Sequence, residues 1–192
     1  NGGFLHSAHW GADWNASTVL EAEQWVHAAW VYDGATDTAT MYLNGEIDGG
    51  PQAQRAPNGG GTFLFGGRNN GEAPYNGYVD DVTIWRSALP QGNIMALAEG
   101  ASPIGVGGPG ATYSQNFDGF DDGTTDLEDG SVMTGAAASV QDGRLQLTID
   151  QQGLGFSSFS VPELPGSAQG FTVSFDYELY DSPGANDPAD GF

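Results

Sequence analysis

Residues 171–180, with the sequence FTVSFDYELY, form the clearest secondary-structure signal in the chain. Apolar side chains occupy every second position from Phe171 to Leu179, and Thr172, Ser174, Asp176 and Glu178 alternate with them. This period of two predicts an antiparallel β-strand with one face in a core and the other in water.

The rest of the chain predicts further strands joined by turns. The composition includes 31 glycines and 10 prolines, as expected for an all-β fold with many tight turns. A single short helix is expected over residues 91–99, after Pro90 and before Gly100. Asn44-Gly45 predicts a two-residue hairpin turn. We expect strands over residues 25–32, 39–43, 62–65, 78–85 and 144–149.

The charge of the chain limits its partners. Twenty-five Asp and Glu face four Arg and no Lys, which gives a net charge of −21. Nucleic acids and anionic membranes are bound through Lys and Arg, so neither is expected as a partner. No apolar run is long enough to insert into a membrane. The absence of Cys excludes disulfides and thiol chemistry.

The first half resembles the laminin G-like domains of the concanavalin A-like superfamily. Residues 25–34 (WVHAAWVYDG) carry the strongest motif, and three further segments follow in the order of that family. The resemblance implies an antiparallel β-sandwich, a concanavalin A-like jelly roll. The three segments are residues 41–45 (MYLNG), 65–68 (FGGR) and 77–85 (GYVDDVTIW).

The second half resembles the opening part of legume-type (L-type) lectin domains. Residues 117–119 (FDG), 143–148 (GRLQLT), 171–175 (FTVSF) and 189–192 (ADGF) carry this resemblance. It implies that Asp190 binds sugar hydroxyls, with Gly191 and Phe192 beside it. Trp10 and Trp14, on a polar and Gly-rich stretch, are candidates to stack on a sugar or to cap the core.

These resemblances predict a chain with two incomplete parts. Residues 1–100 would close one sandwich, residues 101–112 would be a Gly/Pro linker or crossing loop, and residues 113–192 would open a second sandwich. We expect a piece of a longer tandem protein. The alternatives are one permuted sandwich closed by both parts, or a filament in which neighbouring chains complete each other.

No arrangement of residues predicts catalysis. Glycosidases of this superfamily place three acids on one strand, whereas Glu46-Ile47-Asp48 has no third acid after it and flanks a turn. His6, His9 and His27 lack the spacing of a triad or a zinc site, and His27 is expected to pack or to form a hydrogen bond.

Two acidic segments are candidates for a structural calcium ion. In Asp80-Asp81, alternation places one carboxylate at the edge of a buried face, where either a cation or backbone amides must satisfy it. Asp118, Asp121 and Asp122 lie in an acidic loop that falls short of an EF-hand, because Phe120 replaces a ligand, and a solvated turn is the alternative.

The expected function is binding. We predict a secreted, non-catalytic module for glycans or glycoproteins, located outside the cell or at its surface. The alternatives are a structural subunit that polymerises with copies of itself, and an accessory module of a carbohydrate-active enzyme.

Overall fold

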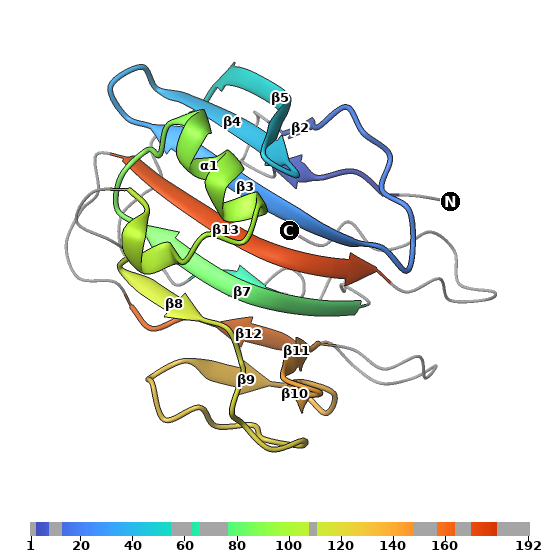
Figure 1. The fold of residues 1–192 in the computed structure, drawn as a ribbon. Helices are drawn as coiled ribbons and strands as arrows, with labels where there is room; N and C mark the ends of the chain where they lie inside the picture. The colour runs from blue at the N-terminus through green and yellow to red at the C-terminus, as the bar shows by residue number, and fades with distance from the viewer. Residues whose placement is uncertain are drawn as a thin grey trace.

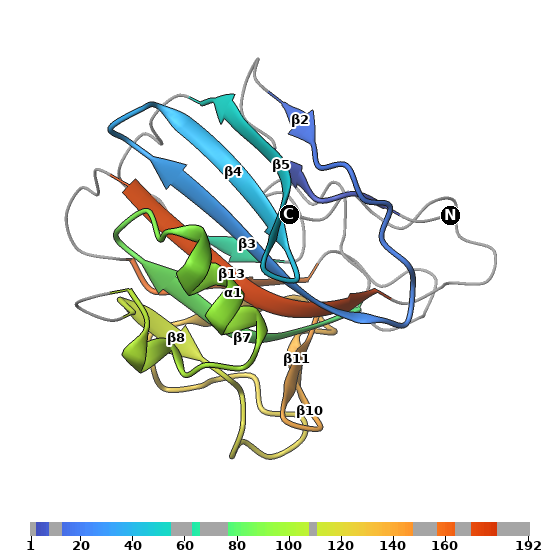
Figure 2. The same ribbon diagram turned by 45° about the horizontal axis from the view of Figure 1, so that its top comes forward.

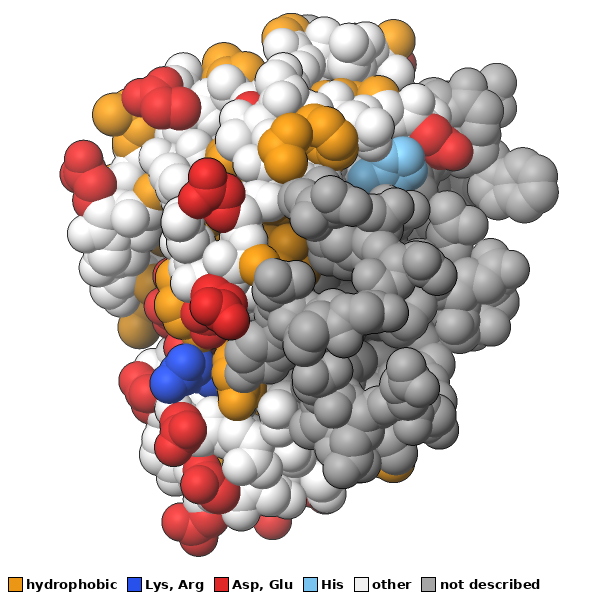
Figure 3. All heavy atoms as spheres, turned by 90° about the vertical axis from the view of Figure 1, so that its right-hand side faces the viewer, with side chains coloured by type: hydrophobic (Ala, Val, Ile, Leu, Met, Phe, Trp, Pro, Cys, Tyr) orange, Lys and Arg blue, Asp and Glu red, His pale blue; other side chains and the backbone are white. Residues whose placement is uncertain are grey.

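A computed structural model describes residues 3–7, 13–54, 63–65, 77–107, 111–147, 157–163 and 170–179. Within them, a large antiparallel sheet faces two small sheets on one side and a helix on the other. The predicted all-β sandwich is therefore confirmed. No helix among these residues is long and apolar enough to cross a membrane. The described surface in Figure 3 shows many scattered acidic side chains and few basic ones.

Strand β13 (Gly170–Leu179), the strongest strand predicted from the sequence, lies at the centre of the large sheet. It pairs on one side with β3 (Trp25–Asp33) and on the other with β7 (Gly77–Trp85). Figure 1 shows it running between these two strands from the first half of the chain. Strands from both expected parts thus share one sheet, as the alternative of a single closed sandwich requires.

The expectation of a wet face on β13 is wrong along most of the strand. Thr172 is fully buried, and its Oγ1 donates to Ser87 O at 2.8 Å and accepts from Leu89 N at 2.9 Å. Ser174 is also buried, whereas Asp176 and Glu178 are half-buried. The chain after β7 and helix α1 (Gln91–Ala98) cover this part of the sheet, so polar residues face a second core and not water.

That second core lies between the large sheet and α1, the helix that lies in front of β13 in Figure 1. Ile94 and Leu97 of the helix pack with Ala29, Val31 and Trp85 of the sheet. The helix covers residues 91–98 and is followed by Gly100 at φ +86°, which confirms its prediction.

Residues 101–107 pack on the same core as a crossing loop. Val106 is buried there, and its carbonyl accepts a hydrogen bond from Trp85 Nε1 at 3.2 Å. A short 3₁₀ turn, η1 (Pro103–Gly105), precedes it. The segment is therefore tied to β7 by a buried contact, unlike a free linker.

The main core lies between the large sheet and the small sheets. It joins inward residues of β3, β7 and β13 with Leu5, with Phe65 of β6 (Leu64–Phe65) and with Phe159 of β12 (Ser158–Ser160). In Figure 2 the pair β1 and β2 stands beside β5, at the far edge of the large sheet from β10. The small sheets thus cover the inner face in two separate places.

The remaining strands follow the expected order. Asn44 and Gly45 have φ of +50° and +85°, which confirms the predicted turn. The large sheet has the order β10-β11-β7-β13-β3-β4-β5, with β8 also on β7, and the small sheets are β1-β2 and β6-β12-β9. Their bounds are β1 (His6–Ser7), β2 (Trp14–Asn15), β4 (Thr38–Leu43), β5 (Glu46–Ala53), β8 (Tyr113–Gln115), β9 (Val132–Thr134), β10 (Ser139–Gln141) and β11 (Arg144–Gln146).

Candidate functional site

A pocket of about 320 Å³ lies over the inner face of the large sheet, between β1 and β6. We call it the trough. Its size is within the range of small-molecule sites. Its floor comes from β3, β4 and β13, and its sides come from the two small sheets. The lining residues are Leu5, His6, Ser7, Ala28, Ala29, Trp30, Met41, Gln54, Phe63, Leu64, Phe65, Phe171, Val173 and Phe175.

Aromatic rings make up much of the trough. The Trp30 and Phe171 ring centroids are 4.8 Å apart, and Phe63 meets Phe171 edge-on at 5.1 Å. Phe65 meets Phe175 edge-on at 5.2 Å. Such pairs are close enough to hold one another in place, so the trough has a preformed aromatic surface.

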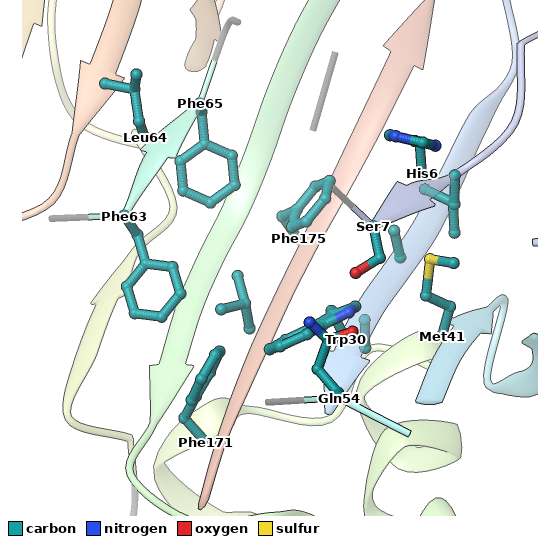
Figure 4. Close-up of a pocket in the computed structure, with 14 residues that line it drawn as sticks. His6, Ser7, Trp30, Met41, Gln54, Phe63, Leu64, Phe65, Phe171 and Phe175 are labelled. Carbon is teal, nitrogen blue, oxygen red and sulfur yellow. The ribbon is translucent and has the colours of Figure 1, made fainter. Parts of the chain in front are cut away.

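Two N–H groups at the floor lack acceptors among the described residues. They are Nε1 of Trp30 and Nε2 of Gln54, both buried, and only 3% of Gln54 is exposed. In Figure 4 the Gln54 amide reaches toward the Trp30 indole. A buried donor without a partner costs about 1–3 kcal/mol, so an acceptor that reached either atom, after the side chains that cover it had moved, would be stabilised here.

Gln54 is held from two sides. Its backbone N–H donates to Asp37 O at 2.8 Å, and its Oε1 accepts a hydrogen bond of 3.4 Å from Trp14 Nε1. The second bond fixes the orientation of the amide and leaves Nε2 for the trough. With its oxygen engaged in this way, the carboxamide offers Nε2 as a donor to a ligand.

Trp14 therefore contributes to the site indirectly. Its ring lies against Gly49 of β5, where a Cβ would come within 2.8 Å of Trp14 Cζ3. It also packs on the main core. This packing is compatible with core capping, one of the two alternatives from the sequence, and sugar stacking by Trp14 stays a prediction. Trp10, Asp190, Gly191 and Phe192 lie outside the described residues.

Asp80 and Asp81 lie on the opposite face of the sheet, at an irregularity in the pairing of β7 with β13. Asp81 has φ +50°, and its N–H donates to Asp80 Oδ1 at 2.8 Å. Asp80 is paired in register with Asp176. Burial raises the pKa of Asp80 to about 7 and that of Asp176 to about 6, and neighbouring carboxylates add to both shifts. Burial, followed by the charge of Asp118, also raises the pKa of Asp81.

The loop that carries Asp118, Asp121 and Asp122 makes hydrogen bonds within the fold. Asp118 accepts from Asn116 Nδ2, the carbonyl of Asp121 accepts from Thr124, and Asp122 accepts from Asp142 N at 2.8 Å. All three side chains are exposed. These contacts are compatible with a solvated turn, the alternative to a metal loop, and the metal role of this loop stays a prediction.

The residues named for calcium do not assemble into a metal site within the described chain. No three His, Asp or Glu side chains there are grouped so that they could hold an ion. Calcium binds through six to eight oxygen ligands, far more than one cross-strand pair of carboxylates offers. Calcium therefore stays a prediction.

His27 has the role expected of it. The residue is 8% exposed, and a 2.7 Å hydrogen bond joins its Nε2 and Ser174 Oγ. Burial lowers the pKa of His27 to about 4, so the ring is neutral at pH 7. The serine hydroxyl is buried as well, and this pair serves to join β3 to β13.

Trp30, Gln54 and the phenylalanines of the trough were not predicted as site residues from the sequence. Trp30 stood inside a recognised strand motif, but its inward position was the only available signal. Gln54 follows β5 in a polar stretch, and nothing local distinguishes it from Gln52. Only the fold brings these residues next to Phe63 and Phe171.

Comparisons with known proteins agree with this architecture. Searches of the curated proteins and of the solved structures found no significant match. The resemblance of residues 113–192 to L-type lectins stays a prediction. Residues 3–95 match the family model described as the concanavalin A-like lectin/glucanases superfamily, and the chain folds as the concanavalin A-like β-sandwich that this match implies.

Proposed function

We propose that this chain is a non-catalytic glycan-binding module of a larger extracellular protein and that the trough is its binding site. The superfamily match supports a module of the carbohydrate-binding type. The observation that carries the assignment to the trough is the pair of buried donors, Trp30 Nε1 and Gln54 Nε2, beside an aromatic surface.

This combination suits the two kinds of surface that a sugar presents. A ring or hydroxyl oxygen of the sugar accepts the hydrogen bonds that both donors lack. The C–H face of the sugar packs on the Trp30 ring, where apolar contact is favourable. Relief of two unpaired donors adds to the affinity, because each costs about 1–3 kcal/mol when it is left buried.

Binding of glycans is tested by a glycan array followed by calorimetry on the glycans that bind. We expect Trp30→Phe and Gln54→Met to weaken binding by about tenfold each, which corresponds to the loss of one hydrogen bond. Trp25→Phe and Gln52→Met are matched controls. Trp25 lies on the same strand with its ring against Arg144 on the outer face, and Gln52 is exposed on β5. Both controls should bind as the parent does.

An array without any binding, with protein shown to be folded by circular dichroism, would contradict the proposed function. Equal losses in the control variants would place the site elsewhere. Thermal melts of all four variants separate lost contacts from lost folding.

The non-catalytic part of the proposal rests on the side chains of the described lining. Glycoside hydrolysis commonly needs two carboxyl groups flanking the bond, and no Asp or Glu is among the described residues that line the trough. Glu46 instead accepts from Gln91 Nε2 at 3.0 Å, and Asp48 accepts from Thr18 Oγ1 at 2.6 Å. Incubation of a bound glycan with the protein, analysed by mass spectrometry, should return it uncleaved.

The filament of strand-exchanged chains receives less support. Strands from both parts of the chain already pair within one sheet, so neighbouring chains are not needed to complete it. Light scattering should give the mass of a monomer at micromolar concentration. Secretion, adhesion and the accessory role beside a carbohydrate-active enzyme stay predictions from the sequence.

A further inference from the structure

The trough has a polar and an apolar end. Figure 4 shows Ser7 and His6 on the side of β1, with Gln54 below them, and Phe63 and Phe65 on the side of β6. The unpaired donors, Trp30 Nε1 and Gln54 Nε2, lie toward the polar end. The polar groups of the lining are therefore not spread evenly around a ligand.

Phenylalanines dominate the other end. Phe63 and Phe65 lie opposite Phe171 and Phe175 of β13, in two edge-on pairs at 5.1 and 5.2 Å. The lining residues between them, Leu64 and Val173, are apolar as well. Nothing in this part of the described lining can form a hydrogen bond through its side chain.

A free monosaccharide fits only one of these ends. Hydroxyl groups surround a hexose, so those that faced the phenylalanines would lose water without gaining a partner. Carbon atoms placed at the same end gain from leaving water. The preferred ligand has hydroxyls at one end and an apolar group at the other.

We propose that the trough recognises a glycoside with an apolar aglycone. The sugar lies at Trp30, Gln54 and Ser7, and the aglycone lies among Phe63, Phe65, Phe171 and Phe175. This inference rests on the proposed function and specifies the ligand class of the same site.

Paired glycosides test the inference by calorimetry. Methyl and phenyl β-glycosides of glucose, galactose and mannose are compared, together with the same pair for the terminal sugar of any glycan that binds on the array. Phenol alone is the third probe. For at least one sugar, the phenyl glycoside should bind at least tenfold more tightly than the methyl glycoside, and phenol at least tenfold more weakly than the phenyl glycoside.

Variants assign the preference to the two ends. Phe63→Leu should reduce the advantage of the phenyl glycoside over the methyl glycoside to less than threefold. Gln54→Met should weaken both glycosides by the same factor. Phe4→Leu, at an exposed phenylalanine outside the lining, is the matched control and should change neither. Melting curves show that each variant is folded.

Three results would overturn the inference. Equal affinity for the methyl and phenyl glycosides would contradict the proposed binding of an aglycone and would not contradict the proposed glycan-binding function. Binding of phenol as tight as that of the phenyl glycoside, without any methyl glycoside binding, makes the trough a site for apolar molecules and removes both proposals. Failure of every probe, together with an array that binds nothing, also removes both.

Discussion

Asp80 of β7 and Asp176 of β13 are direct partners across the centre of the large sheet, next to an irregularity where Asp81 adopts φ +50°. Two carboxylates in such a position repel each other when both are ionised. The backbone hydrogen bond from Asp81 N satisfies one oxygen of Asp80 and does not remove the repulsion. Burial of the two carboxylates is the larger cost of ionising them and their repulsion adds to it, so the fold tolerates this pair best when one member is protonated.

The first prediction concerns stability against pH. The folded pKa of Asp80 is raised to about 7 and that of Asp176 to about 6, above the ordinary value of an unfolded Asp. Between about pH 4 and pH 7 the folded chain thus holds more protons than the unfolded chain, and the free energy of unfolding falls as pH rises. Asp80→Asn should raise it by about 1–2 kcal/mol at pH 8, after allowance for solvent screening, and change it little at pH 4.

Urea unfolding at pH 4, 6 and 8 measures this effect. Asn keeps the oxygen that accepts from Asp81 N and removes only the charge. Asp126→Asn, in an exposed turn, is the control and should show the parent's pH dependence. A loss of stability in Asp80→Asn that is equal at all three pH values would contradict the cost assigned to an ionised Asp80 in this buried position.

Calcium binding is tested on the parent and on Asp80→Asn. An ion held by Asp80 and its neighbours would raise the melting temperature at pH 8, where the carboxylates are ionised, and Asp80→Asn would lose that rise. Scanning calorimetry with 1 mM calcium or with EDTA distinguishes the cases. Identical melting temperatures in both buffers would contradict the structural calcium ion predicted from the sequence.

One buried hydroxyl group joins the chain after β7 to strand β13 at the second core. Thr172 Oγ1 links the Ser87 carbonyl and the Leu89 N–H to the central strand. Thr172→Val keeps the shape and leaves a buried backbone N–H unpaired, so it should lower the free energy of unfolding by about 2–3 kcal/mol. Thr172→Ser keeps the hydroxyl and should lose about 1 kcal/mol, for the missing methyl. Equal losses in the two variants would assign the effect to packing.

Much of the fold followed from the sequence because each strand carries its own pattern. The alternation in β13, the Asn44-Gly45 turn and the Pro90-to-Gly100 helix are local signals, and the structure has all three. The burial of Thr172 and Ser174 was not predictable, because it depends on α1 and the preceding loop packing on that face. The placement of β13 between β3 and β7 is likewise a long-range relationship that periodicity does not encode.

The candidate site was less predictable than the fold. Sequence reasoning sought exposed tryptophans and acidic clusters, which are familiar features of sugar and calcium sites. The trough instead depends on donors that lack partners, and Gln54 becomes such a donor only because Trp14 engages its oxygen. Neither residue is near the other in sequence, so no motif could indicate the pair.

Replacing Gly45, which packs on α1, or Gly92, which lies in α1, by Ala should change the free energy of unfolding in opposite directions. Gly45 has φ +85°, and a Cβ there would lie 2.9 Å from Met95 Cα. Gly45→Ala should therefore lower the free energy of unfolding by at least about 1–2 kcal/mol. Gly92 lies within the helix with no atom near its Cβ position, so Gly92→Ala should raise it by about 0.5–1 kcal/mol. Denaturant melts compare both with the parent, and a stabilised Gly45→Ala would contradict the close packing of the turn on α1.

The hydrogen bond between Trp14 and Gln54 can be tested by a double-mutant cycle on glycan affinity. Trp14→Phe removes the N–H that orients the amide and should weaken binding by about threefold to tenfold, since a net hydrogen bond of this kind is worth about 0.5–1.5 kcal/mol. In a Gln54→Met background the same change should have no further effect, because Trp14 makes no direct contact in the trough. Additive losses would instead mean that Trp14 acts on the ligand by another route, for example by the packing of its ring on Gly49.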